Sequence, residues 1–137
     1  MRLATLLLSA AVLATGVTAS AATPSRQARA EAKLETLLAG RVPGKPVRCI
    51  DLHRIDGSQI IDGTAIVYRN GSRLYVNRPQ TGASFLDSDD ILLTKSWGSQ
   101  LCRIDTVRLL DRSSRFPRGF VGLGDFVPYT APKPARS

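Results

Sequence analysis

The chain is 137 residues long and carries 19 Lys and Arg residues against 11 Asp and Glu residues, a formal net charge of +8 at pH 7. This length allows one small domain with a single hydrophobic core. One histidine and two widely spaced cysteines argue against a zinc site and a Cys-x-x-Cys redox centre, whereas the basic charge favours anionic partners.

The first residues have the pattern of a secretory signal peptide. Arg2 supplies a positive end, residues 3–17 form an apolar run, and Ala19-Ser20-Ala21 is a small-residue cleavage site. The apolar run is too short for a membrane-spanning helix, which needs roughly 20 apolar residues. We predict a signal peptide over residues 1–21, cleaved after Ala21 or after Ala22, and a periplasmic or secreted protein. An uncleaved anchor is the alternative.

Residues 22–46 are predicted to hold an N-terminal helix and a linker. Ser25 is a suitable N-cap, and Gly40 is suited to end the helix. Between them, Leu34, Leu37 and Leu38 recur at helical spacing, so we expect a helix over residues 26–39. The Pro- and Gly-containing residues 41–46 then lead into the next domain.

Residues 47–127 have the short apolar runs and frequent turn dipeptides of a β domain. We predict a mostly β fold, a small antiparallel barrel or roll of six to seven short strands preceded by one N-terminal α-helix. Expected strands include residues 47–52, a buried strand over residues 91–94 and a last strand over residues 120–126. Residues 128–137 contain Pro128, Pro132 and Pro134 and are predicted to be a disordered tail.

The strongest turn signal is Asn70-Gly71, which lies between two strand-like segments. A two-residue loop at these positions would place Val67 opposite Leu74 and Ala65 opposite Val76. These four side chains would form one apolar face of the hairpin. A one-residue slip would mix this face with the other, so the pattern specifies which residues share a face.

The segment from residue 101 to residue 110 changes the phase of its alternation. Cys102 and Ile104 share one parity, whereas Val107 and Leu109 share the other. We expect a bulge or a bend near Asp105 to reconcile the two halves. A carboxylate at this position would bond to backbone amides or have a shifted pKa.

Cys49 and Cys102 are the two cysteines of the chain. Exported proteins meet an oxidising compartment, so one disulfide between them is the simple prediction. Two buried thiols that never meet are the alternative, because sequence does not reveal the distance between the residues.

Four segments, LAGRVPGKPVRCI, IIDGTAIVYRNGSRLYVNRP, SQLCRIDTV and GLGDFVPY, resemble a family of small exported proteobacterial proteins of unknown function. The resemblance spans residues 38–129 and implies export, a small β-rich domain and no assigned activity. Relatives often carry further cysteines where this chain has Ala83-Ser84 and Val121. If those two are partners in relatives, the resemblance implies that Cys49 and Cys102 form the other pair.

No residue pattern predicts a catalytic, cofactor-binding or metal site. Cys49 and His53 on one strand would lie about 13 Å apart at about 3.3 Å per residue, too far for a nucleophile and its base. The acidic residues Asp87, Asp89 and Asp90 lack the glycine and distal glutamate of a calcium loop. An exposed histidine and a solvated acidic turn are therefore expected.

The favoured function is a non-catalytic periplasmic binding or structural module without a cofactor. One alternative is a binder of polyanions such as envelope phosphates, with Arg112, Arg115 and Arg118 as the contacts. The other is an enzyme of unrecognised type that uses a buried carboxylate such as Asp105. The partner is unidentified; an anionic envelope component fits the charge, and export argues against nucleic acid.

Overall fold

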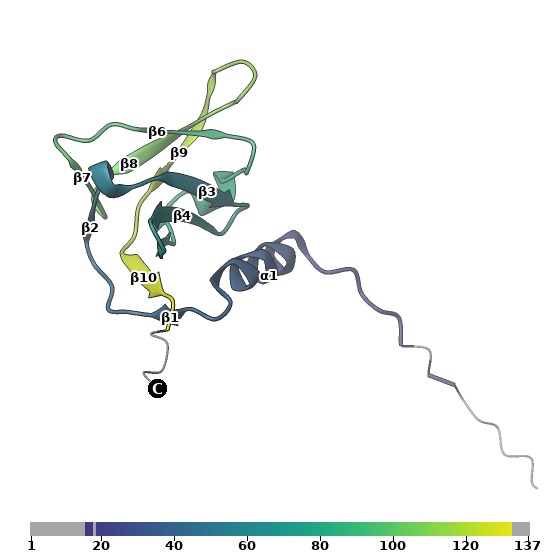
Figure 1. Cartoon of the computed structure of the whole chain (residues 1–137). Coiled ribbons are helices and arrows are strands. Elements are labelled where there is room, and N and C mark those ends of the chain that lie inside the picture. The colour runs from purple at the N-terminus through teal and green to yellow at the C-terminus, as the bar shows by residue number, and fades with distance from the viewer. Residues whose placement is uncertain (1–15, 18, 133–137) are drawn as a thin grey trace, which may run out of the picture.

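The computed structural model describes residues 16–17 and 19–132. Most of the predicted signal peptide and residues 133–137 of the predicted tail lie outside this part. Figure 1 shows a single long helix beside a β domain. Among the described residues, no helix is both long and apolar enough to cross a membrane.

The helix α1 (Arg26–Leu38) confirms the predicted helix to within one residue. The hydroxyl of Ser25 accepts a hydrogen bond from the Ala28 N–H at 3.1 Å, as an N-cap does. Gly40 follows the helix with φ +73°, a conformation that glycine adopts without steric cost. Ala30 and Leu34 are the buried side chains of α1, and they hold it against the β domain.

A five-stranded antiparallel sheet forms the larger part of the β domain. Its strands, in spatial order, are β1 (Val42–Pro43), β10 (Phe126–Thr130), β5 (Arg73–Asn77), β4 (Ala65–Asn70) and β3 (Gly57–Ile61). The N-terminal linker thus contributes the short edge strand β1, and β3 forms the opposite edge.

Two smaller antiparallel sheets complete the fold. One has the order β6 (Ile91–Thr94), β8 (Thr106–Leu110), β9 (Pro117–Gly122), and the other pairs β2 (Cys49–Asp51) with β7 (Gln100–Cys102). Short 3-10 turns lie at η1 (Leu52–Arg54) and η2 (Ala83–Phe85). The chain passes from β9 into β10, so the three-stranded and five-stranded sheets are joined at one side.

The predicted mostly β, antiparallel fold with one N-terminal helix is confirmed. The strand count is wrong, because the described residues form ten strands, and these do not close into a barrel. Turns divide predicted strands in two: residues 101–110 contribute to β7 and β8, and residues 120–126 to β9 and β10. The bounds predicted for β6 are confirmed, but Leu93 is 46% exposed, so that strand is not fully buried.

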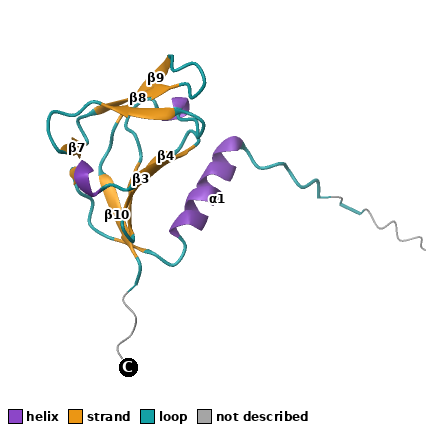
Figure 2. Cartoon of the chain, turned by 45° about the horizontal axis from the view of Figure 1, so that its top comes forward, coloured by secondary structure: helices purple, strands orange, loops and turns teal. Residues whose placement is uncertain are grey.

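Two layers of apolar side chains lie on opposite faces of the five-stranded sheet. One face packs against α1 through residues such as Ile61, Val67 and Val76. The other, with Ile60, Tyr68 and Phe126 among its members, packs against the three-stranded sheet. Figures 1 and 2 show α1 beside the β3–β4 hairpin and away from β8. The order of layers is therefore α1, five-stranded sheet, three-stranded sheet.

The hairpin of β4 and β5 has the predicted faces but a different register. Val67 lies opposite Val76, and Asn70 lies opposite Arg73, so the loop is Gly71-Ser72 rather than Asn70-Gly71. The backbone N–H of Gly71 donates to the Asp56 carboxylate at 2.7 Å, and this contact from outside the hairpin fixes the turn. A shift of two residues leaves each side chain on its predicted face, because strands alternate with a period of two.

The prediction of a disordered tail that begins at Pro128 is wrong for residues 128–130. Residues 128–130 belong to β10, where Pro128 lies opposite Tyr75 and Tyr129 opposite Leu74. A proline is tolerated here because the strand next to it, β1, is only two residues long.

Candidate functional site

The outer edges of β3 and β6 face a groove that we call the seam. β3 is the last strand of the five-stranded sheet, and β6 is the first strand of the three-stranded sheet. Within the described residues, neither strand has a hydrogen-bonded neighbour at its outer edge. The two sheets are joined through β9 and β10 on one side and remain apart at the seam on the other.

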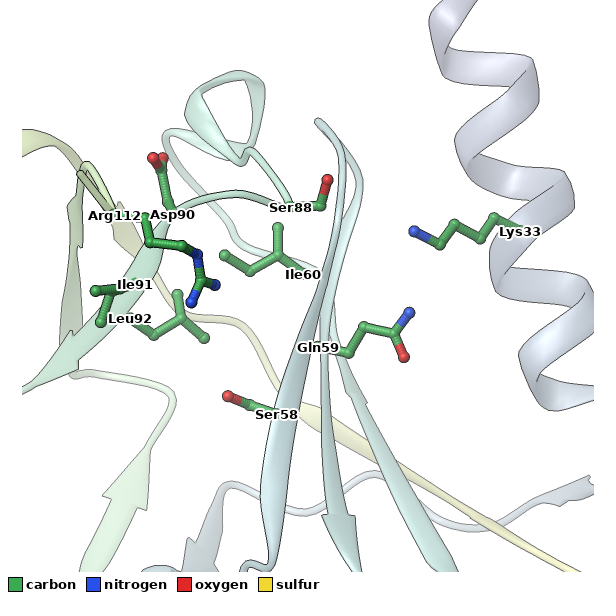
Figure 3. A pocket seen from close by; sticks show the side chains of 9 residues that line it. All are labelled: Lys33, Ser58, Gln59, Ile60, Ser88, Asp90, Ile91, Leu92 and Arg112. Carbon is green, nitrogen blue, oxygen red and sulfur yellow. The ribbon is translucent and has the colours of Figure 1, made fainter.

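The seam holds two adjoining hollows, of about 470 Å³ and about 260 Å³. Ser58 and Leu92 line both, so the two hollows are neighbours along the seam. The larger is lined by Lys33, Ser58, Gln59, Ile60, Ser88, Asp90, Ile91, Leu92 and Arg112 (Figure 3).

Two cationic side chains flank the larger hollow from different layers. Lys33 extends from α1 toward β3, and Arg112 lies on the other side of β3, beside Leu92 (Figure 3). Both residues are exposed. The Arg112 Nε donates to the carbonyl of Asp89 at 3.1 Å, and this contact holds the side chain over the groove.

The seam also holds the buried side-chain polar atoms that have no hydrogen-bond partner. Among the described residues these atoms are the Tyr68 hydroxyl and both carboxylate oxygens of Asp90. Tyr68 lines the smaller hollow and Asp90 the larger one. Burial raises the pKa of both groups. Because native proteins pair most buried polar groups, such a concentration at one groove marks it as a candidate site.

Asp90 lies next to a partner of opposite charge. Its Oδ1 is 3.4 Å from Arg118 Nη1, and in Figure 3 its carboxylate points away from Ile60 and Leu92. Burial has the larger effect on the Asp90 pKa and raises it; Arg118 opposes this effect, and nearby Asp87 and Asp111 add to it.

The three arginines predicted to contact anions do not form one free cluster. Arg118 is engaged with Asp90 and Asp87, and Arg112 is bonded to the carbonyl of Asp89. Arg115 lies in the β8–β9 loop, where its φ of +63° closes the turn. The acidic run of residues 87–90 thus partly neutralises the basic loop, and of the three arginines Arg112 is the one that lines the larger hollow.

The Asp105 carboxylate is engaged in a structural hydrogen bond, whereas the alternative enzyme function needs a free carboxylate at this position. Its Oδ2 accepts the N–H of Cys102 at 2.7 Å, and its own N–H donates to the Cys102 carbonyl at 2.9 Å. These bonds make the bend that separates β7 from β8, as the change of phase predicted. Asp105 lines neither hollow of the seam.

The predicted disulfide between Cys49 and Cys102 is confirmed. The two residues lie directly opposite each other in the β2–β7 pair, with their Cα atoms 4.0 Å apart. A disulfide is compatible with an extracellular protein, because disulfides persist in oxidising compartments.

His53 is exposed, as predicted, and its backbone N–H donates to the carboxylate of Asp51.

Comparisons with models of protein families, with curated proteins and with solved structures find no match to this chain.

The seam and the contribution of Lys33 to it were not predicted from the sequence, whereas Arg112 was among the predicted anion contacts. Lys33 was part of a basic helix, and Arg112 part of a basic loop, with 78 residues between them. The shortness of the segment GSQII and its start at Gly57-Ser58-Gln59 were a usable signal for an edge strand. Nothing in the sequence indicated that the free edge of β3 faces β6.

Proposed function

We propose that the protein is a non-catalytic binding module of the periplasm, and that the seam is its binding site. The observation that carries this proposal is a groove between two unpaired strand edges that is lined by the buried Tyr68, whose hydroxyl has no hydrogen-bond partner. Because buried polar groups in native proteins are usually paired, a ligand in the groove is a source of the hydrogen bond that the Tyr68 hydroxyl lacks.

The alternative functions have less support. The proposal of polyanion binding through the basic loop is weakened because Arg118 already forms ion pairs with Asp87 and Asp90. The proposal of an enzyme that uses Asp105 is weakened because this carboxylate accepts a hydrogen bond from the backbone N–H of Cys102. Membership of the resembled family of exported proteins remains a proposal and adds no activity.

Site-specific photocrosslinking in the living cell tests the proposal. A benzoylphenylalanine at Ser58, which is exposed and lines both hollows, is expected to form a discrete adduct on irradiation. The matched control is the same probe at Ile104, which is 87% exposed and lines neither hollow. Absence of an adduct from position 58, or equal labelling from both positions, would contradict a binding role for the seam.

A further inference from the structure

We propose that the seam takes an extended peptide carrying a carboxylate, which adds a strand to the free edge of β3. This inference rests on the proposed function of the seam and names the class of its ligand. The ligand would be a segment of another protein, held by main-chain hydrogen bonds and by Lys33 and Arg112.

The free edge of β3 can accept an added strand. A strand at the edge of a sheet presents backbone N–H and C=O groups that an extended chain can pair with. Three consecutive residues of β3, Ser58, Gln59 and Ile60, line the larger hollow, as expected if the open side of the strand faces it. At about 3.3 Å per residue, the five residues of β3 offer about 16 Å of edge, enough for a peptide of about five residues.

The layers on either side of β3 define where an added strand would lie. Lys33 comes from the layer of α1, whereas Leu92 and Arg112 belong to the layer of the three-stranded sheet. The larger hollow is lined by both layers and so extends around the edge of β3 (Figure 3). A strand bound to this edge would continue the five-stranded sheet, with Lys33 on its α1 side and Leu92 and Arg112 on the other side.

Successive side chains of the bound peptide would point to opposite faces of the sheet, so the residues on each side of β3 determine which peptide side chains fit. Side chains on one face would meet Lys33 and Gln59, and those on the other would meet Leu92 and Arg112. Figure 3 shows Gln59 toward α1, and Ser58 and Ile60 on the opposite side. A carboxylate beside either cation gains a charge-assisted hydrogen bond, and an apolar side chain can cover Leu92.

Charge decides between an acidic peptide and a second copy of this chain. Asp90 is the carboxylate among the residues lining the larger hollow, and it lies beside Arg118, so Lys33 and Arg112 are available to a ligand. The β3 segment GSQII has no acidic side chain, so a second β3 could not pair with these cations. Repulsion between two chains of formal charge +8 also opposes this pairing.

A defined peptide pool provides the probe. Acetylated heptapeptides made of Val, Thr, Tyr, Asp and Glu are passed over the immobilised full-length secreted protein at low salt, and retained peptides are identified by mass spectrometry. Acidic members are expected to be retained. Retention should fall at least tenfold for the double variant Lys33→Glu, Arg112→Glu, and should weaken as salt is raised.

Two controls separate the parts of the inference. Arg115→Glu carries the same type of charge change on the same loop, at a residue that lines neither hollow, and should retain peptides like the natural protein. A second pool with alternate backbone nitrogens methylated should not be retained, because methylation removes the N–H groups that pair with a strand edge.

The outcomes also separate this inference from the proposed function. Failure of every peptide to bind, or equal retention of the methylated pool, would overturn strand addition. If the Ser58 adduct still forms in that case, the seam binds a ligand of another class. Unchanged retention by the Lys33→Glu, Arg112→Glu variant would overturn the assigned carboxylate contact, and dimers crosslinked through position 58 would favour a second copy instead.

Discussion

Asp90 shows how one residue can oppose the stability of its own fold. Its side chain is almost fully buried, and neither carboxylate oxygen has a hydrogen-bond partner. Since burial raises its pKa in the folded protein, the folded state binds a proton at this site more readily than the unfolded chain does. The ionised carboxylate therefore lowers stability at pH above the raised pKa, and this cost shrinks as the pH falls through the raised pKa and is gone below the ordinary pKa of the unfolded chain.

We expect Asp90→Asn to increase the free energy of unfolding at pH 7, and the gain to shrink as the pH falls through the raised pKa of Asp90. Urea unfolding of the variant and of the natural protein between pH 7 and pH 3 measures this difference. The control is Asp89→Asn, which removes the same charge from an exposed residue. A variant less stable than the natural protein at pH 7 would show that the pair with Arg118 outweighs the cost of burial.

Asn77 is the opposite case, a buried polar residue with its partners in place. Its amide nitrogen donates to the Gly124 carbonyl at 2.7 Å, and the Gly124 N–H donates to its amide oxygen at 3.0 Å. The side chain thus ties the end of β5 to the turn between β9 and β10.

We expect Asn77→Ala to lower the free energy of unfolding by about 3 kcal/mol, because both backbone groups of Gly124 lose their partner inside the core. Chemical denaturation measures the change. Asn70→Ala, at the end of β4, is the control and should cost about 1 kcal/mol or less. Equal losses in the two variants would contradict a special role for the buried amide.

At the scale of elements, α1 is held by a narrow apolar stripe and one ion pair. Leu34 is 2% exposed, and Glu31 accepts hydrogen bonds from two nitrogens of Arg78 at 2.8 and 3.0 Å. The basic first turn of the helix is unfavourable for its dipole, so packing and the Ser25 cap must hold it in place. This docking is what brings Lys33 to the seam.

We expect Leu34→Ala to cost about 3 kcal/mol and to loosen α1 from the sheet. Trypsin cleavage after Arg29 and Lys33 should become faster while the β domain keeps its β-sheet circular dichroism. Glu35→Ala, at an exposed position of the same helix, should leave both readings unchanged. Cleavage at the natural rate in Leu34→Ala would mean that contacts other than this stripe hold the helix.

At the scale of the whole molecule, the disulfide connects parts that are distant in sequence. Cys49 and Cys102 are separated by 53 positions, and between them lie β3, β4, β5 and β6. The bridge therefore encloses both strands that border the seam. Its loss would release the short β2–β7 sheet, which has three residue pairs.

We expect the variant Cys49→Ala, Cys102→Ala to lose about 4 kcal/mol of stability in the chain-entropy description of a loop of this length. Urea unfolding measures the loss. In the natural protein, a thiol assay under denaturing, non-reducing conditions should detect no free thiol. Two free thiols in that assay would contradict the bridge.

Local sequence patterns were sufficient for the helix, for the bounds of β6 and for the faces of the β4–β5 hairpin. These features depend on neighbours along the chain: the Ser25 cap, an apolar run of four residues, and alternation with a period of two. The hairpin register was missed because the Asp56 carboxylate, which lies just before β3 and accepts a hydrogen bond from the Gly71 N–H, decides where the turn lies.

By itself the sequence determined a mostly β, antiparallel domain with one helix and a pair of cysteines able to bridge it. The tertiary structure alone decided that β3 and β6 are edges facing each other, and that Lys33 and Arg112 flank the groove between them. The physical reason is that alternation records which face of a strand is buried but not which strand lies at its edge. Strand order and the docking of α1 follow from packing over the whole chain.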